Sequence, residues 1–264
     1  MPTQMLIYET AVPVSSGRHA KCSVEVGNDY AFTRNLNSIP LMAVEFPQAA
    51  AEYAIVFAAN GETVVPVVIL GARQDQNLYL ADDKWKANYI PAFVRRYPFV
   101  FSSSDDGKTF TLCVDEAFQG LNYLGRGKAL FGADGKPTEY VDNVLKFLQE
   151  YRVQFMNTEN FCKKLKELEV LEPMQAQFTL ADGEKMSLGG FMVVDRAKLK
   201  ALADDKLGEL VRSDEMELVH LHLHSMRHFT DLKDKLALTK ARPAAEVAAA
   251  AAADAPADAP VTAD

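Results

Sequence analysis

The sequence predicts an α+β protein, with a β-rich N-terminal half of short strands and a C-terminal half that mixes helices with strands. Three observations support this prediction: apolar, β-branched runs joined by turn-forming pairs, apolar residues at helical spacing after Pro137, and prolines spread through the first half. Because proline cannot donate a backbone hydrogen bond, these prolines favour short or edge strands over a long regular sheet.

Two β-hairpins are predicted in the N-terminal half. Each joins two apolar runs across an Asn-Gly or Asp-Gly pair, and such pairs favour tight turns because their residues tolerate positive φ. The first hairpin pairs 54–58 with 63–70 about Asn60-Gly61, and the second pairs 98–101 with 109–114 about Asp106-Gly107.

Two amphipathic helices are predicted next in the chain. The first begins after Pro137-Thr138, and a second begins after Thr158, whose hydroxyl is a suitable N-cap. The apolar residues that would face the core are Val141, Val144, Leu145 and Leu148 in the first helix and Phe161, Leu165 and Leu168 in the second.

A third hairpin is predicted from 175–180 and 186–194, which flank Asp182-Gly183. After this hairpin, Asp195 is expected to cap a helix, and a further short helix is expected at 205–212.

Residues 216–224 alternate apolar and polar side chains, and this alternation predicts a strand with Val219, Leu221 and Leu223 on one face. A final helix is expected to follow, with Met226 and Phe229 on its apolar face.

We expect residues 1–240 to form one domain, β-rich over about 1–120 and α+β over about 121–240. Residues 241–264 are expected to be a disordered tail, because they are almost entirely Ala, Pro, Asp and Val and show no amphipathic period.

The chain is acidic overall, with a formal net charge of −8 and a pI of about 5.2. Nucleic acids and anionic membranes attract clustered Lys and Arg, so we expect neither as a general partner. The most apolar stretch, 64–72, contains Pro66 and is far shorter than the roughly 20 apolar residues of a membrane-spanning helix. We therefore expect no membrane span.

The three cysteines, Cys22, Cys113 and Cys162, are far apart and form no CxxC pair. An odd, scattered set favours free thiols over a disulfide framework or a zinc site. Residues 1–14 lack the basic start and the following apolar run that are typical of a secretory signal. These features predict a cytoplasmic protein.

The densest aromatic segment of the chain gives the predicted ligand-binding site: Trp85, Tyr89, Arg95, Arg96 and Tyr97. Aromatic rings provide a large contact area at low entropic cost, and arginine provides a forked donor for carboxylate or phosphate. The competing interpretation is structural: the rings belong to the core and the arginines pair with nearby Asp or Glu.

Four of the five histidines fall at His220, His222, His224 and His228. On a strand the first three would project from one face, and imidazole is a common metal ligand. Adjacent same-face side chains on a strand lie about 6–7 Å apart, however, which is too far for three of them to meet one ion. We therefore predict no metal site and interpret these residues as the polar face of a strand.

No catalytic or nucleotide-binding motif is present: the chain lacks G-x-S-x-G, H-E-x-x-H, a Walker loop and G-x-G-x-x-G. We therefore expect no cofactor.

Several longer sequence motifs occur in a specific order along residues 5–237. They are SIPLMAVEFPQAAAEYAIVF at 38–57, VPVVILG at 65–71, NLYL at 77–80, YIPAFVRRYPF at 89–99, VDE at 114–116, LGGFMVVDRAKLKAL at 188–202 and HLHSM at 222–226. Through this combination the chain resembles the SapC family of bacterial proteins. A peptide-transporter permease of the same name spans the membrane several times, and the absence of a span excludes it.

The resemblance implies a protein associated with bacterial surface-layer arrays, with relatives encoded near TonB-dependent receptors. It supplies no catalytic residues. We therefore expect a non-enzymatic accessory or binding protein of surface-layer or nutrient-uptake systems, with a protein or peptide partner. The alternative is a metal-dependent enzyme that uses His220, His222 and His224.

Overall fold

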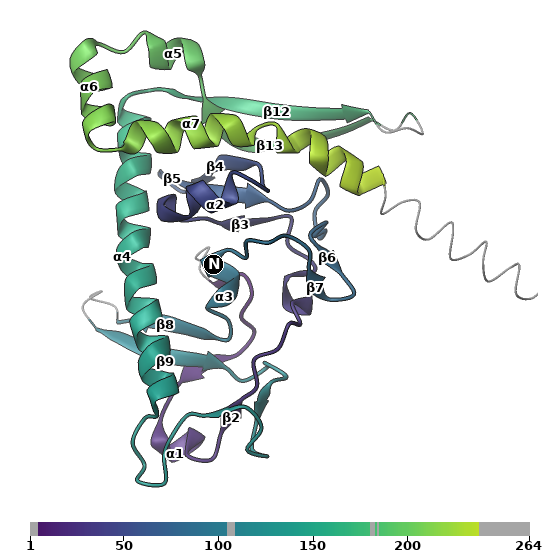
Figure 1. The fold of residues 1–264 in the computed structure, drawn as a ribbon, viewed down its shortest axis with the longest axis vertical. Coiled ribbons are helices and arrows are strands. Elements are labelled where there is room, and N and C mark those ends of the chain that lie inside the picture. The colour runs from purple at the N-terminus through teal and green to yellow at the C-terminus, as the bar shows by residue number, and fades with distance from the viewer. Residues whose placement is uncertain (1–4, 105–108, 180–182, 184, 238–264) are drawn as a thin grey trace, which may run out of the picture.

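The fold is described by a computed structural model that covers residues 5–104, 109–179, 183 and 185–237 (Figure 1). Within these residues, antiparallel sheets combine with helices, which confirms the predicted α+β class. The tail predicted at 241–264 lies outside the described residues.

The largest sheet of the described residues is antiparallel and five-stranded, in the order β12-β13-β4-β5-β3, and we call it the central sheet. Its strands are β3 (Ser38–Pro40), β4 (Ile55–Asn60), β5 (Thr63–Ile69), β12 (Leu171–Thr179) and β13 (Lys185–Val194). The sheet draws strands from both halves of the chain, because β13 pairs with β4 through Phe191–Ala58 and Met192–Phe57.

The three predicted hairpins are present. The β4–β5 turn lies at Gly61-Glu62, one residue later than predicted, because Asn60 still pairs with Thr63 and Gly61 takes the positive φ of 63°. Strands β12 and β13 form the third hairpin. The second hairpin joins β8 (Phe99–Ser103) to β9 (Phe110–Asp115), and residues 105–108 between them lie outside the described part.

Three smaller antiparallel sheets complete the strands of the described residues, in the orders β1-β9-β8, β10-β2-β11 and β6-β7. The remaining strands are β1 (Ala11–Pro13), β2 (Ser23–Val24), β6 (Leu80–Ala81), β7 (Lys84–Trp85), β10 (Leu121–Asn122) and β11 (Lys128–Ala129). All are two or three residues long, and those within residues 1–120 agree with the short strands predicted for the proline-punctuated half.

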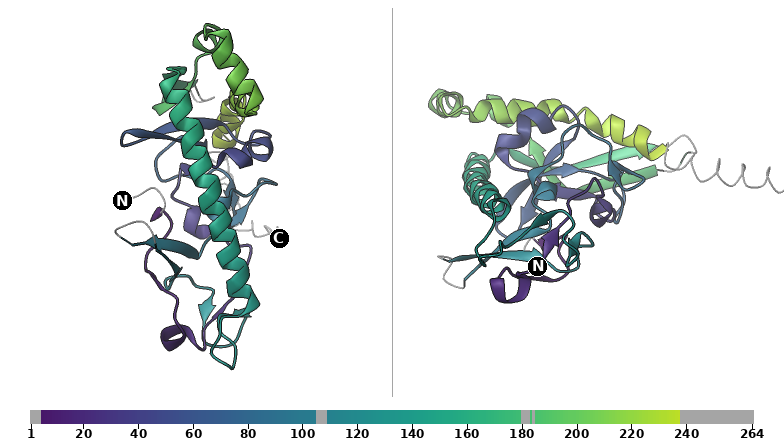
Figure 2. Two further views of the ribbon diagram at one scale, coloured as in Figure 1. Left: turned by 90° about the vertical axis from the view of Figure 1, so that its left-hand side faces the viewer. Right: turned by 60° about the horizontal axis from the view of Figure 1, so that its bottom comes forward.

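One long helix, α4 (Glu139–Glu167), replaces the two helices predicted for 139–168. It runs along most of the length of the molecule (Figure 2). Thr158 is therefore not an N-cap: its hydroxyl donates to the Gln154 carbonyl one turn earlier and accepts from the Ala43 amide at 2.9 Å. No helix of the described residues combines the length and apolarity needed to cross a bilayer.

Residues 216–224 form a helix, so the predicted strand is wrong. They lie in α7 (Glu215–Ser225), and its buried residues are Val219, His222 and Ser225, three apart as on one helical face. Asp195 caps α5 (Arg196–Lys200) as predicted, and α6 (Asp204–Arg212) matches the short helix expected at 205–212. Residues 228–237 are also helical, as expected.

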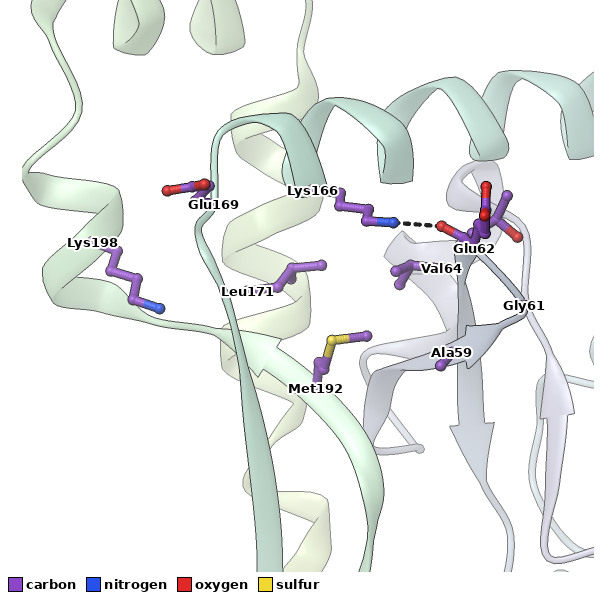
Figure 3. A pocket seen from close by; sticks show the side chains of 10 residues that line it. Ala59, Gly61, Glu62, Val64, Lys166, Glu169, Leu171, Met192 and Lys198 are labelled. Carbon is purple, nitrogen blue, oxygen red and sulfur yellow. Dashed lines mark hydrogen bonds between the residues drawn. The ribbon is translucent and has the colours of Figure 1, made fainter.

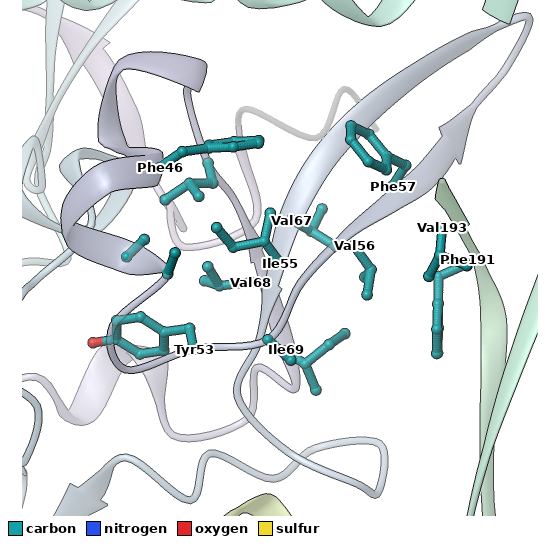
Figure 4. Packing of buried hydrophobic residues seen from close by; sticks show 14 of the residues in the cluster. Phe46, Tyr53, Ile55, Val56, Phe57, Val67, Val68, Ile69, Phe191 and Val193 are labelled. Atoms are coloured by element: carbon teal, nitrogen blue, oxygen red, sulfur yellow. The ribbon is translucent and has the colours of Figure 1, made fainter. Parts of the chain in front are cut away.

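The main core lies between the central sheet and the elements packed on it (Figure 4). Successive residues of β5 are buried from Val64 to Ile69, so both faces of this strand are covered. Phe46 of α2 (Phe46–Ala49) and Tyr53 pack against the same strands. The short helices α1 (Ser16–His19), η2 (Ala31–Thr33), η3 (Ala43–Glu45) and α3 (Ala92–Arg95) connect the strands of this half.

Candidate functional site

Trp85 belongs to the core. Its indole Nε1 donates to the Tyr53 hydroxyl at 2.8 Å, and Tyr53 donates in turn to the Tyr89 carbonyl. The edge of the Tyr30 ring meets the indole at 5.9 Å. Because its side chain is buried, Trp85 packs in the core and supports the segment that follows it.

Two carboxylates that flank α2 hold the segment after Trp85. Glu45 accepts from the Ala92 amide at 2.7 Å and from the Tyr89 hydroxyl at 2.6 Å. Glu52 accepts from the backbone amides of Asn88 and Tyr89, each at 3.1 Å. Burial and then the nearby Glu45 carboxylate raise the pKa of Tyr89, so its hydroxyl stays a donor. The Tyr89 ring is therefore fixed in place.

The helix α3 and its C-cap place the two adjacent arginines in different environments. Arg96 is buried, with its guanidinium 4.5 Å from the Phe93 ring centre and 4.9 Å from that of Tyr151. Arg95 is exposed, and its Nε donates to the Ile90 carbonyl at 2.8 Å. The sequence pattern alone treats the two arginines as equivalent, but the structure separates them.

The exposed Arg95 lies close to two half-buried aromatic rings, and we call Arg95, Tyr89 and Phe147 the Arg95 platform. The guanidinium carbon is 5.9 Å from the Tyr89 ring centre and 5.6 Å from the Phe147 ring centre. The described residues supply no ion pair to Arg95. A guanidinium carries five N–H donors, so donors beyond those that meet the Ile90 carbonyl and the Tyr89 hydroxyl remain for a ligand.

Tyr97 is half-buried in a second aromatic group. Its ring stacks on Phe32 at 4.1 Å and meets Tyr8 at 5.5 Å and the edge of Phe118 at 5.3 Å. Burial and then the neighbouring Asp115 carboxylate raise the pKa of Tyr97. Of the five predicted site residues, Arg95 is exposed, Tyr89 and Tyr97 are half-buried, and Trp85 and Arg96 are buried.

The histidines do not converge. Because the segment is helical, His220 and His224 share a face, whereas His222 points the other way into the core. His228 lies beyond α7, with its ring nitrogens facing the Ala50 carbonyl and Asp231. Among the described residues, no group of three or more His, Cys, Asp or Glu side chains is arranged to hold a metal ion.

His222 instead completes the central sheet. If the β13–β4 register continued, Val194 would lie opposite Ile55. The imidazole stands between them: its Nε2 accepts from the Val194 amide at 3.0 Å, and its Nδ1 donates to the Ile55 carbonyl at 2.8 Å. Ser225 then accepts from the Ile55 amide at 3.0 Å. Burial lowers the pKa of His222 to about 4, so the ring is neutral at pH 7.

A surface cavity of about 430 Å³ opens beneath the C-terminal end of α4 (Figure 3). Its apolar lining consists of Ala59, Val64, Leu171 and Met192, and its polar lining includes Glu62, Lys166, Glu169 and Lys198. The sequence gives no signal for this cavity, because its lining comes from three separate stretches of the chain, 59–64, 166–171 and 192–198.

The three cysteines are free and buried, which agrees with the prediction of unpaired thiols. Burial raises the pKa of Cys162 to about 12 and also raises that of Cys113. We expect iodoacetamide to modify the folded protein slowly and to modify three thiols once urea unfolds it, without reductant. Intact-mass spectrometry checks this, and an adduct count below three in urea would show a disulfide.

Comparison with known proteins identifies a family. A family model described as SapC matches residues 14–232, which confirms the resemblance expected from the sequence motifs. No curated protein and no solved structure matches the chain.

Proposed function

Because the chain belongs to the SapC family, we propose that it is a non-enzymatic binding protein that captures an anionic group of a protein or peptide partner on the Arg95 platform. The family's association with bacterial surface layers and nutrient uptake supports partners from those systems. The free thiols support a cytoplasmic location.

The observation that carries this proposal is the fixed position of Arg95. Its Nε is anchored to the Ile90 carbonyl, and the Tyr89 ring beside it is anchored through Glu45. A side chain that is already held loses less conformational entropy when it binds a ligand. The planar guanidinium can then pair with a carboxylate or phosphate through two parallel hydrogen bonds.

The metal-dependent enzyme is not favoured. It requires His220, His222 and His224 to face one ion, but α7 directs them to different sides. His222 also uses both ring nitrogens within the sheet.

Binding of an acidic peptide tests the proposal. We expect a peptide of alternating Gly and Glu with blocked ends to bind the protein, and Arg95→Ala to weaken binding about tenfold or more, because a hydrogen-bonded charge is lost. Isothermal titration calorimetry measures this loss. Arg95→Lys should recover part of the affinity, since it keeps the charge but not the fork.

Two controls distinguish the platform from general charge attraction. The same peptide with Gln in place of Glu should not bind, and Arg212→Ala, at an exposed arginine on α6, should bind like the wild type. Equal weakening by Arg95→Ala and Arg212→Ala would rule out a specific site at Arg95.

A further inference from the structure

The cavity of Figure 3 lies against the central sheet, because its lining residues Ala59, Val64, Leu171 and Met192 belong to β4, β5, β12 and β13. Lys166 from α4 bridges one side of it, because its Nζ donates to the Glu62 carbonyl in the β4–β5 turn. Leu171 and Met192 form the opposite wall. The walls are therefore regular elements that are hydrogen-bonded to one another, so the cavity exists without a ligand.

The charged groups around this cavity are arranged asymmetrically. In Figure 3 the Lys198 side chain extends toward the side of the cavity that Leu171 forms, whereas the Glu169 carboxylate points away from the cavity. Among the described residues, the Lys198 ammonium makes no hydrogen bond or ion pair, whereas its backbone amide donates to the Asp195 cap. The cavity thus has an apolar floor and, at its opening, the positive charge of Lys198.

From this arrangement we propose that the cavity binds a small amphipathic monocarboxylate, with its apolar body on Ala59, Val64, Leu171 and Met192 and its carboxylate on Lys198. Lys166 adds a second positive charge at the rim. This site is separate from the Arg95 platform and does not depend on the function proposed there.

Size and chemistry limit the ligand class. A cavity of about 430 Å³ is at the small end of the range for small-molecule sites, about 300–1,000 Å³, so it suits a body of medium chain length or a single ring. The apolar floor favours burial of CH₂ groups or a ring, and it offers little to a sugar or nucleotide. A neutral alcohol of the same length would gain the apolar contact without the ion pair.

Calorimetric titration with sodium octanoate, below its micelle concentration, tests the proposal. We expect one site per chain, with binding about tenfold weaker for Lys198→Gln, because the charge-assisted contact is lost. Octan-1-ol should bind the wild type about tenfold more weakly than octanoate does. The two ligands should bind the Lys198→Gln variant with equal affinity. Ala59→Phe, which fills the cavity from an exposed strand position without changing charge, should abolish binding.

The controls use residues close to the cavity and residues far from it. Lys200→Gln changes an exposed lysine on the same helix that does not line the cavity, and it should bind octanoate like the wild type. Arg95→Ala should also leave octanoate binding unchanged. Binding that resists both Lys198→Gln and Ala59→Phe, or that falls with Arg95→Ala, would overturn the assignment of this cavity.

Discussion

Arg96→Ala is expected to lower the free energy of unfolding by about 3 kcal/mol, whereas Arg95→Ala should change it by less than about 1 kcal/mol. Arg96 is buried against Tyr8, Phe93 and Tyr151, so truncation removes cation–π contacts and leaves a cavity. Arg95 is exposed and loses only surface contacts. Urea unfolding of both variants, followed by circular dichroism, measures the difference.

Arg96→Lys serves as the conservative control. It keeps a positive charge among the rings but loses the planar stacking of the guanidinium, so its stability should fall between those of the wild type and Arg96→Ala. Similar losses in Arg95→Ala and Arg96→Ala would mean that both side chains are buried, and the Arg95 platform would then be ruled out as a surface.

His222→Ala is expected to lower the free energy of unfolding by about 3 kcal/mol or more at pH 7. The substitution leaves the Val194 amide and the Ile55 carbonyl buried without their partner, and each such group costs about 1–3 kcal/mol. His220→Ala, at an exposed position on the same helix, should change stability by less than about 0.5 kcal/mol.

The same residue predicts a pH dependence of stability. The pKa of His222 falls from an ordinary 6.5 to about 4 in the folded protein, chiefly because burial disfavours the charged ring. Between these values the unfolded chain binds a proton that the folded chain does not, so stability decreases as pH falls from about 6.5 to about 4. The accumulated loss is roughly 3 kcal/mol.

Urea unfolding at several pH values separates this contribution from the others. His222→Ala should flatten the pH dependence across the window, while His220→Ala should retain the slope of the wild type. An unchanged slope in His222→Ala would mean that another group causes the acid sensitivity.

Elements with local signals were predictable from the sequence. The β4–β5 turn follows from a glycine beside Asn60, and α5 follows from Asp195, whose carboxylate accepts from the Ala197 amide at 2.7 Å. In contrast, α7 was mistaken for a strand, because apolar residues at 219, 221 and 223 alternate. Its helical face is defined by contacts of His222 and Ser225 with a strand far earlier in the chain, which no local period reveals.

The candidate site was predictable only as a segment. The content of aromatic residues and arginines identifies the segment 85–97. The different environments of Arg95 and Arg96, however, depend on α3 and on aromatic rings from α4 and from near the N-terminus. Glu45, which fixes Tyr89, is 44 residues away from it in sequence. Contacts of this range depend on the tertiary fold, so residue type and spacing could not supply them.

The imidazole that joins β4 to β13 also determines when this protein can finish folding during synthesis. Ile55 is separated by 167 residues from His222 and by 170 from Ser225, its other polar partner in α7. A ribosome must therefore make nearly all of the described chain before the backbone of β4 is satisfied on that side. Until then the Ile55 end of β4 lacks these two partners, although β13 can already pair with β4 at Phe57 and Ala58, and unpaired backbone groups of a strand are prone to wrong pairing. Helix α7 therefore supplies the last hydrogen-bond partners of β4, and fragments that end before α7 should not fold completely.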